Sequence, residues 1–150
     1  GSSGAASSNT ATPTQTQSFL AALEAKRGSA LTLAERLQVQ GLTGTAKVGL
    51  NNAQNNFLNK VGAQVGLNGA VIAALFPEAG KPLSENAAVA KIESSLGKKL
   101  TVADQTAVKA ATALRNNSLA SLKTGLAASI GSRIGMSTEV VLALMPMLGL

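Results

Sequence analysis

Apolar residues recur at spacings of three and four in two stretches of the chain, which is the period of one face of an α-helix. The first series consists of Leu50, Ala53, Phe57, Val61 and Val65. The second consists of Leu119, Leu122, Leu126, Ile130 and Ile134. Neither series alternates with the period of two that a half-buried strand shows. The pattern predicts an all-α protein with both apolar stripes in its core.

The two stripes belong to a longer internal repeat with an offset of 69 positions. Segment 18–77 aligns with segment 87–146 without a gap, and glycines, a proline and apolar positions agree together at that one offset. The identical pairs include Glu24/Glu93, Gly28/Gly97, Leu31/Leu100, Thr32/Thr101, Thr43/Thr112, Gly62/Gly131, Gly66/Gly135 and Pro77/Pro146. We therefore predict a compact bundle of about eight helices, built from two similar helical units of about 60 residues, 18–77 and 87–146.

Local signals place the helix ends. Ser18 is a candidate N-cap for the first helix, and Gly28 directly follows it. Thr32 with Glu35 forms a capping box for the next helix. The helical pattern continues from there to Gly66, but Gly41, Gly44 and Gly49 interrupt it, each costing about 1 kcal/mol against alanine. We expect a break or kink between roughly 43 and 49, which gives four helices in each unit.

Two short apolar segments, 70–76 and 138–145, follow the candidate caps Asn68 and Ser137 and precede Pro77 and Pro146. Because they are apolar nearly all round, we expect them to be buried, with each proline ending its helix. The predicted core contains Leu50, Phe57, Val61, Val65, Ile72, Leu75, Leu119, Leu126, Ile130, Ile134, Val141 and Leu144. The apolar tail 147–150 should fold back onto the core or face a protein partner, such as a second copy of the chain.

Residues 1–17 contain no charge and no apolar period, so we expect a flexible linker ahead of a single helical domain, 18–150. The four residues Gly1-Ser2-Ser3-Gly4 fit a cloning remnant. The whole segment also fits the spacer that follows a processed export signal, as in bacterial lipoproteins.

The composition excludes several kinds of chemistry. The chain has no cysteine and no histidine, so it lacks disulfides, thiolate zinc sites and the commonest general base. Its net charge is +6, but no run of five basic residues occurs. With no Trp or Tyr for stacking, we expect no specific nucleic-acid site. The apolar stretch 140–150 is too short for the ~20 residues of a transmembrane helix.

Few residues are candidates for a site. Ser95 and Lys98 have the spacing of penicillin-recognising serine enzymes, but Lys98 is explained by its place at a helix end. The basic pair Lys26-Arg27 has the same explanation, and the repeated Glu24/Glu93 indicates a scaffold position. We predict no catalytic, cofactor-binding or metal-binding residue.

These observations favour a non-enzymatic structural or interaction module, exported to the cell envelope of a bacterium. Its expected location is periplasmic, outer-membrane-tethered or secreted. The alternative is a cationic, membrane-active helical protein that acts on anionic lipid. The expected partners are a protein or a second copy at the apolar C-terminus, with weak contacts to anionic lipid or another polyanion.

Overall fold

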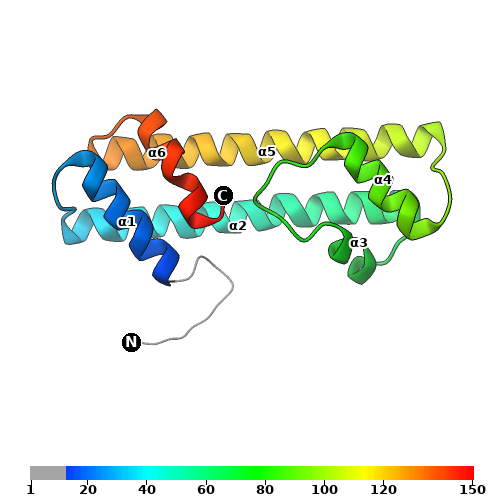
Figure 1. The fold of residues 1–150 in the computed structure, drawn as a ribbon, viewed down its shortest axis with the longest axis horizontal. Helices are drawn as coiled ribbons and strands as arrows, with labels where there is room; N and C mark the ends of the chain where they lie inside the picture. The colour runs from blue at the N-terminus through cyan, green and yellow to red at the C-terminus, as the bar shows by residue number, and fades with distance from the viewer. Residues whose placement is uncertain (1–12) are drawn as a thin grey trace. The chain divides into compact units, whose positions relative to one another are not determined.

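The structure is a computed structural model that describes residues 13–150, and it is helical, without a β-strand, over that range. Its elements are α1 (Pro13–Arg27), α2 (Leu33–Val65), α3 (Gly69–Leu75), α4 (Glu85–Leu96), α5 (Val102–Ile134), α6 (Thr138–Leu144) and the 3-10 helix η2 (Met145–Leu148) (Figure 1). The all-α prediction is confirmed. The described residues form six α-helices, so the expectation of about eight is wrong.

The number of helices is lower than expected because the helix ends expected between 43 and 49 do not occur. α2 is unbroken through Gly41, Gly44 and Gly49, and α5 is unbroken over the same length (Figure 1). Glycine lowers helix propensity, but packing along a long helix outweighs a penalty of about 1 kcal/mol per residue. Gly49 also leaves room for Leu122, because a Cβ at position 49 would lie 2.9 Å from Cδ2 of Leu122. Its position reflects close helix packing, and no break occurs there.

The first helix also differs from the expectation. α1 begins at Pro13, so residues 13–17 belong to the helix and not to the linker expected over 1–17. Proline suits the first turn of a helix, where its missing N–H has no intrahelical partner to lose. The rest of that segment, 1–12, lies outside the described residues.

Packing divides the chain into two compact units. Among the described residues, unit 1 contains 13–49 together with 121–150, and unit 2 contains 50–120. Each unit therefore combines parts of both sequence segments, 18–77 and 87–146. Within unit 2 the long helices run antiparallel, because Gln54 contacts Arg115 while Gln64 contacts Asp104.

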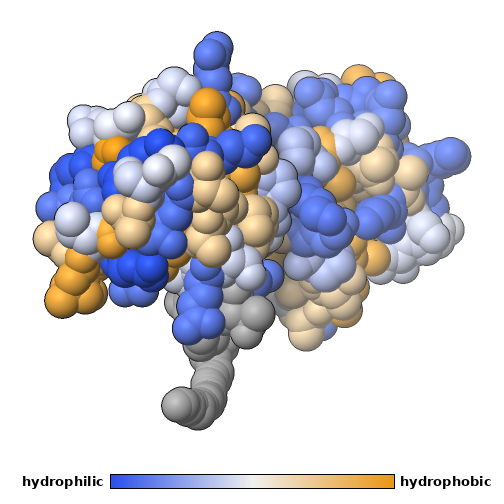
Figure 2. Space-filling model, turned by 60° about the vertical axis from the view of Figure 1, so that its left-hand side comes forward, coloured by the Kyte–Doolittle hydropathy of each residue, from blue (hydrophilic) through white to orange (hydrophobic). Residues whose placement is uncertain are grey.

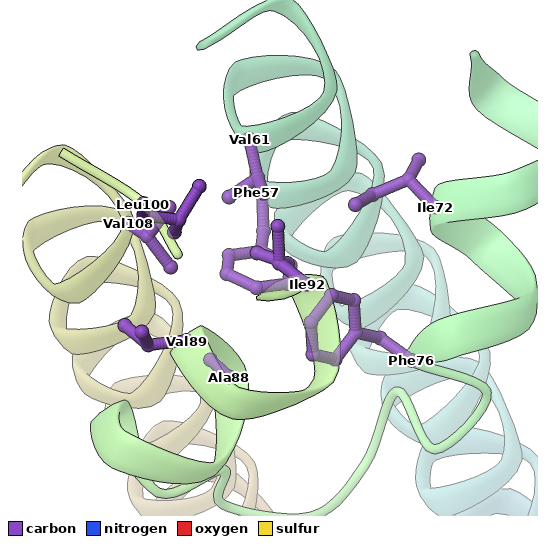
Figure 3. Close-up of a cluster of buried hydrophobic side chains, with 9 residues drawn as sticks. All are labelled: Phe57, Val61, Ile72, Phe76, Ala88, Val89, Ile92, Leu100 and Val108. Atoms are coloured by element: carbon purple, nitrogen blue, oxygen red, sulfur yellow. The ribbon is translucent and has the colours of Figure 1, made fainter. Parts of the chain in front are cut away.

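Unit 2 has an aliphatic core around two phenylalanines (Figure 3). The rings of Phe57 and Phe76 meet edge to face, with centroids 5.2 Å apart and planes at 78°. The cluster comprises Phe57, Val61, Ile72, Phe76, Ala88, Val89, Ile92, Leu100 and Val108. It joins α3 and α4 to the long helices of the same unit.

Unit 1 is built in a similar way from α1, α6 and η2, which contact one another. Its buried residues include Phe19, Leu20, Leu23, Val39, Leu126, Ile130, Ile134, Val141 and Met145. The chain end folds back as expected for two of its apolar residues, since Leu148 and Leu150 are buried. Met147 is 38% exposed, so it does not fold back onto the core, and its contact with a protein partner stays a prediction.

The predicted core is otherwise buried, except that Val65, Leu75 and Leu144 are only partly covered. The short helices are less buried than expected, because Ile72 in α3 and Val141 in α6 are the fully buried positions among their residues. Each of these helices has two turns, and one face of so short a helix reaches the core.

The two prolines end their helices differently. α3 stops at Leu75, and Phe76 leaves the helical region with φ −129° and ψ 71°, as expected before Pro77. After α6 the chain continues through Pro146 as the 3-10 helix η2, so this proline does not stop the helical path. It occupies the first turn of η2, where proline fits without losing a hydrogen bond.

Candidate binding groove

The residues singled out by motif lie at or near helix ends. Ser95 lies near the end of α4, Lys98 follows that helix, and both side chains are exposed. Within the described part of the chain, neither side chain takes part in a hydrogen bond or ion pair. Arg27 pairs with Glu35 at 2.9 Å and donates to the Ile134 carbonyl at 3.1 Å, so it joins two segments of unit 1.

The repeated glutamates have a scaffold role, as the sequence indicated. Glu24 accepts a hydrogen bond from the Leu31 amide at 2.8 Å. Glu93 accepts one from the Leu100 amide at 2.9 Å. Each carboxylate thereby holds the loop that follows its own helix.

Two kinds of feature, a cluster of metal ligands and a membrane-spanning helix, are absent from the described residues. Among them, no three His, Cys, Asp or Glu side chains come close enough together to hold a metal ion. No helix in 13–150 is both long and apolar enough to cross a membrane.

Arg115 of α5 is the most deeply buried cation, with 3% of its surface exposed. Burial lowers the pKa of its guanidinium from the ordinary value. Its nitrogens donate to Gln54 Oε1 (2.7 Å), Lys81 O (2.9 Å), Asn116 Oδ1 (3.0 Å), Glu78 O (2.7 Å) and Ala79 O (3.5 Å). All five N–H groups of an arginine are thus engaged. Arg115 fixes the α3–α4 loop and has no donor left for a ligand.

Lys47 has a related structural role in unit 1. Its ammonium donates to the Leu148 carbonyl at 2.8 Å, which ties α2 to η2. Burial lowers the pKa of Lys47 below its ordinary value. Both cations, Arg115 buried and Lys47 half-buried, therefore hold backbone carbonyls of the chain that follows a short helix.

Unit 1 has a groove between α2 and α5, with a volume of about 350 Å³. We call it the α2–α5 groove. Its lining residues are Leu42, Thr45 and Ala46 from α2, and Ser121, Leu122, Gly125, Leu126 and Ser129 from α5. Most of these side chains are small. The space is open in particular at Gly125, where an added Cβ would have no atom within 4 Å.

Unit 2 has a smaller cavity, with a volume of about 100 Å³. It is lined mostly at positions that differ by 69 from those lining the α2–α5 groove. Its lining includes Asn56, Lys60, Leu114 and Arg115. The corresponding residues of the α2–α5 groove are Gly125, Ser129, Thr45 and Ala46. Smaller side chains on both long helices thus accompany the wider space in unit 1.

The groove has a simple chemical character. Among the described residues, those lining it carry no charge, and their polar atoms are the hydroxyls of Thr45, Ser121 and Ser129. Leucine side chains supply most of the apolar contact. Such a lining can hold an apolar group by burial and can offer a few hydroxyls for hydrogen bonds. It supplies no group for general acid–base chemistry.

The sequence interpretation missed this groove, although one signal was present. Ser121, Gly125 and Ser129 are small residues at i, i+4 and i+8, which places them on one face of a helix. That stripe borders Leu122 and Leu126, which belong to the predicted core. Reading the stripe as a groove also requires knowing which part of α2 faces it.

Comparisons with protein-family models, with curated proteins and with solved structures found no match to this chain.

Proposed function

We propose that this protein is a non-catalytic binding module, and that its ligand site is the α2–α5 groove of unit 1. The groove itself carries the proposal, with its volume of about 350 Å³ and its lining of leucines and small uncharged side chains. Ligand sites typically measure about 300–1,000 Å³ and are mostly apolar with a few placed polar groups. The groove has both properties.

The size of the groove favours a small ligand over a protein. Leu37 and Val48 of α2 are more than half exposed, at 58% and 57%, and neither lines the groove. Val48 follows the lining residue Thr45 by three positions, so it lies on the same side of α2 and borders the groove. A stable protein–protein interface buries about 1,200–2,000 Å² in total, and a groove of this size provides too little surface alone.

A neutral apolar dye tests the proposal. N-phenyl-1-naphthylamine brightens in apolar surroundings, and the absence of Trp and Tyr leaves no strong protein fluorescence to interfere. We expect saturable binding by the full chain. Gly125→Leu should abolish it, because the new side chain fills open space in the groove.

Gly41→Leu is the matched control. Gly41 is also helical, exposed and open at its Cβ, but it does not line the groove. Gly41→Leu should bind the dye as the unmodified chain does. If Gly125→Leu retains full dye binding, or if the unmodified chain binds none, the proposed function is wrong.

We also infer that segments 18–77 and 87–146 are two copies of one helical unit. The bounds of α2 and α5 differ by 69 positions at both ends, as do those of α3 and α6. Contacts recur at the same offset: Thr43 Oγ1 donates to Val39 O, and Thr112 Oγ1 to Val108 O, both at 2.8 Å. These pairs support the inference. A superposition of 18–77 on 87–146 in an experimental structure tests it, since helices that fail to align would refute it.

The proposal of an exported, cell-envelope protein rests on the composition of 1–17 and stays a prediction. Contact with a protein partner through the C-terminus stays one too, although Met147 is the residue of that tail left with a substantially exposed apolar side chain. Mass measurement in solution tests it, because a strictly monomeric chain at high concentration would count against a second copy as the partner.

The membrane-active alternative is supported by the net charge of +6. On the face shown in Figure 2, hydrophobic surface occurs as separate patches among hydrophilic residues. A membrane-surface helix has a continuous apolar face, so that view favours the binding module. Salt-sensitive leakage from vesicles of anionic lipid would favour the alternative instead.

A further inference from the structure

One exposed cation lies in line with the α2–α5 groove. Arg133 follows Ser129 by four positions on α5, so it lies one turn farther along the same helix face. Helical side chains lean toward the helix N-terminus, which directs Arg133 back toward Ser129 and the groove. Within the described residues, its side chain has no hydrogen bond or ion pair.

The corresponding residue of unit 2 shows where a side chain at this position points. Gln64 lies 69 positions before Arg133, and its amide reaches across from α2 to Asp104 Oδ1 on α5 at 2.7 Å. A side chain here therefore points toward the seam between the two long helices. In unit 1 the residue corresponding to Asp104 is Glu35, whose carboxylate is already paired with Arg27 at 2.9 Å.

We propose that the α2–α5 groove binds a single-chain fatty acid, with its hydrocarbon chain along the uncharged lining and its carboxylate at Arg133. This inference rests on the proposed function and adds the class of ligand. The lining takes the apolar chain, and the unpaired guanidinium complements the negative head. The other end of the groove, near Ser121, offers a hydroxyl and no charge among its lining residues. The ligand therefore has one orientation.

The length of the groove sets the length of the chain. Ser121 to Ser129 covers about 12 Å along α5 at about 1.5 Å per residue. A fully extended chain of single bonds advances about 1.2 Å per bond, so about ten carbons fill that length. Decanoate is therefore the probe of choice, used well below the concentration at which it forms micelles, and decanol is its neutral counterpart.

The experiment measures affinity for both probes by titration calorimetry with the full chain. Arg133→Gln should weaken decanoate binding by up to about fivefold, the upper end of the range of an exposed ion pair, and leave decanol binding unchanged. Arg133→Lys should restore most of the affinity for decanoate. Lys98→Gln removes the same charge from an exposed, unpaired residue of unit 2 and should change neither affinity.

The outcomes separate this inference from the proposed function. If Arg133→Gln binds decanoate as well as the unmodified chain does, the assignment of the head group is wrong, while loss of decanol binding in Gly125→Leu would still support the groove as the site. If Gly125→Leu leaves both affinities unchanged, both proposals fail. Binding to vesicles of anionic lipid without binding of free decanoate would overturn the fatty-acid inference in favour of a membrane surface.

Discussion

Two glycines of α5, six positions apart, should respond in opposite ways to the same substitution. Gly125 is open, with no atom within 4 Å of an added Cβ. Gly131 lies one turn before the end of α5, where the chain turns back. The Met136 amide donates to the Gly131 carbonyl at 2.9 Å, and the Met136 carbonyl oxygen occupies the space of a Cβ at Gly131.

The magnitudes follow from these surroundings. Alanine is favoured over glycine inside a helix by about 1 kcal/mol, so Gly125→Ala should stabilise the fold by about that amount. For a chain of this size, that corresponds to a rise in Tm of about 2–4 °C. Gly131→Ala gains the same propensity, but its methyl group meets backbone that cannot rotate away. Overpacking costs about 1–3 kcal/mol, and contact with rigid backbone places the cost toward the upper end of that range, so we expect a net loss of about 2 kcal/mol after the gain in propensity.

Thermal unfolding followed by circular dichroism at 222 nm measures both effects, with denaturant titration as the check on free energy. Gly49→Ala is an informative third variant, because its Cβ would meet the flexible end of Leu122 at 2.9 Å, and the change should be close to neutral. If the Tm of Gly131→Ala equals or exceeds that of the unmodified chain, the close approach of the Met136 backbone to Gly131 does not exist. A Gly125→Ala variant that melts lower would contradict the open surroundings of that glycine.

Three further predictions concern stability. Arg115→Ala leaves buried carbonyls and the Gln54 amide oxygen without their donor, so it should cost about 2–4 kcal/mol, whereas the exposed Lys60→Ala should change Tm little. Deleting 147–150 removes two buried leucines, worth about 1.5–3 kcal/mol each, and an unchanged Tm would show the tail to be idle. The hydrogen bond from Arg27, and next the Thr32 amide, hold the pKa of Glu35 below its ordinary value of 4.5. The contribution of Glu35 to the free energy of unfolding is therefore fully present above pH 4.5 and is lost as the pH falls below that value. In an acid titration, Glu35→Gln should lose less stability than the unmodified chain.

The starts of α2 and α3 were predictable because each depends on a few neighbouring residues, whereas α1 begins at Pro13 and not at Ser18. Thr32 Oγ1 accepts from the Glu35 amide at 3.1 Å, and Glu35 in return accepts from the Thr32 amide at 2.9 Å, which is the capping box that the sequence indicated. Asn68 likewise caps α3 through the Val71 amide. Signals of this kind act within one turn and do not depend on what the helix packs against.

The glycines inside α2 were misjudged because their effect depends on distant residues. Read locally, Gly41, Gly44 and Gly49 are three penalties close together and predict a break. In the structure, Gly49 gives room to Leu122, which lies 73 positions away in sequence. Whether a glycine breaks a helix or admits a neighbour is decided by tertiary packing, which a single sequence does not display.

The α2–α5 groove was missed for a related reason. The sequence interpretation placed 18–77 and 87–146 in one bundle but did not say which residues of one segment would face which residues of the other. In each structural unit, residues from one segment face residues from the other, as Gln54 faces Arg115. Small side chains on α5 matter only because Ala46 of α2 lines the same groove.

The difference between the two cavities therefore depends on both long helices at once. In unit 2, Arg115 occurs with Asn56 and Lys60, and the space left is about 100 Å³. In unit 1, Ala46 occurs with Gly125 and Ser129, and the space is about 350 Å³. A single large residue on either helix would narrow the groove, so its width requires small residues on both. Because glycine and serine weaken α5 as a helix, the scaffold is less stable than alanine at those positions would make it. We infer that a role for the open groove offsets that cost.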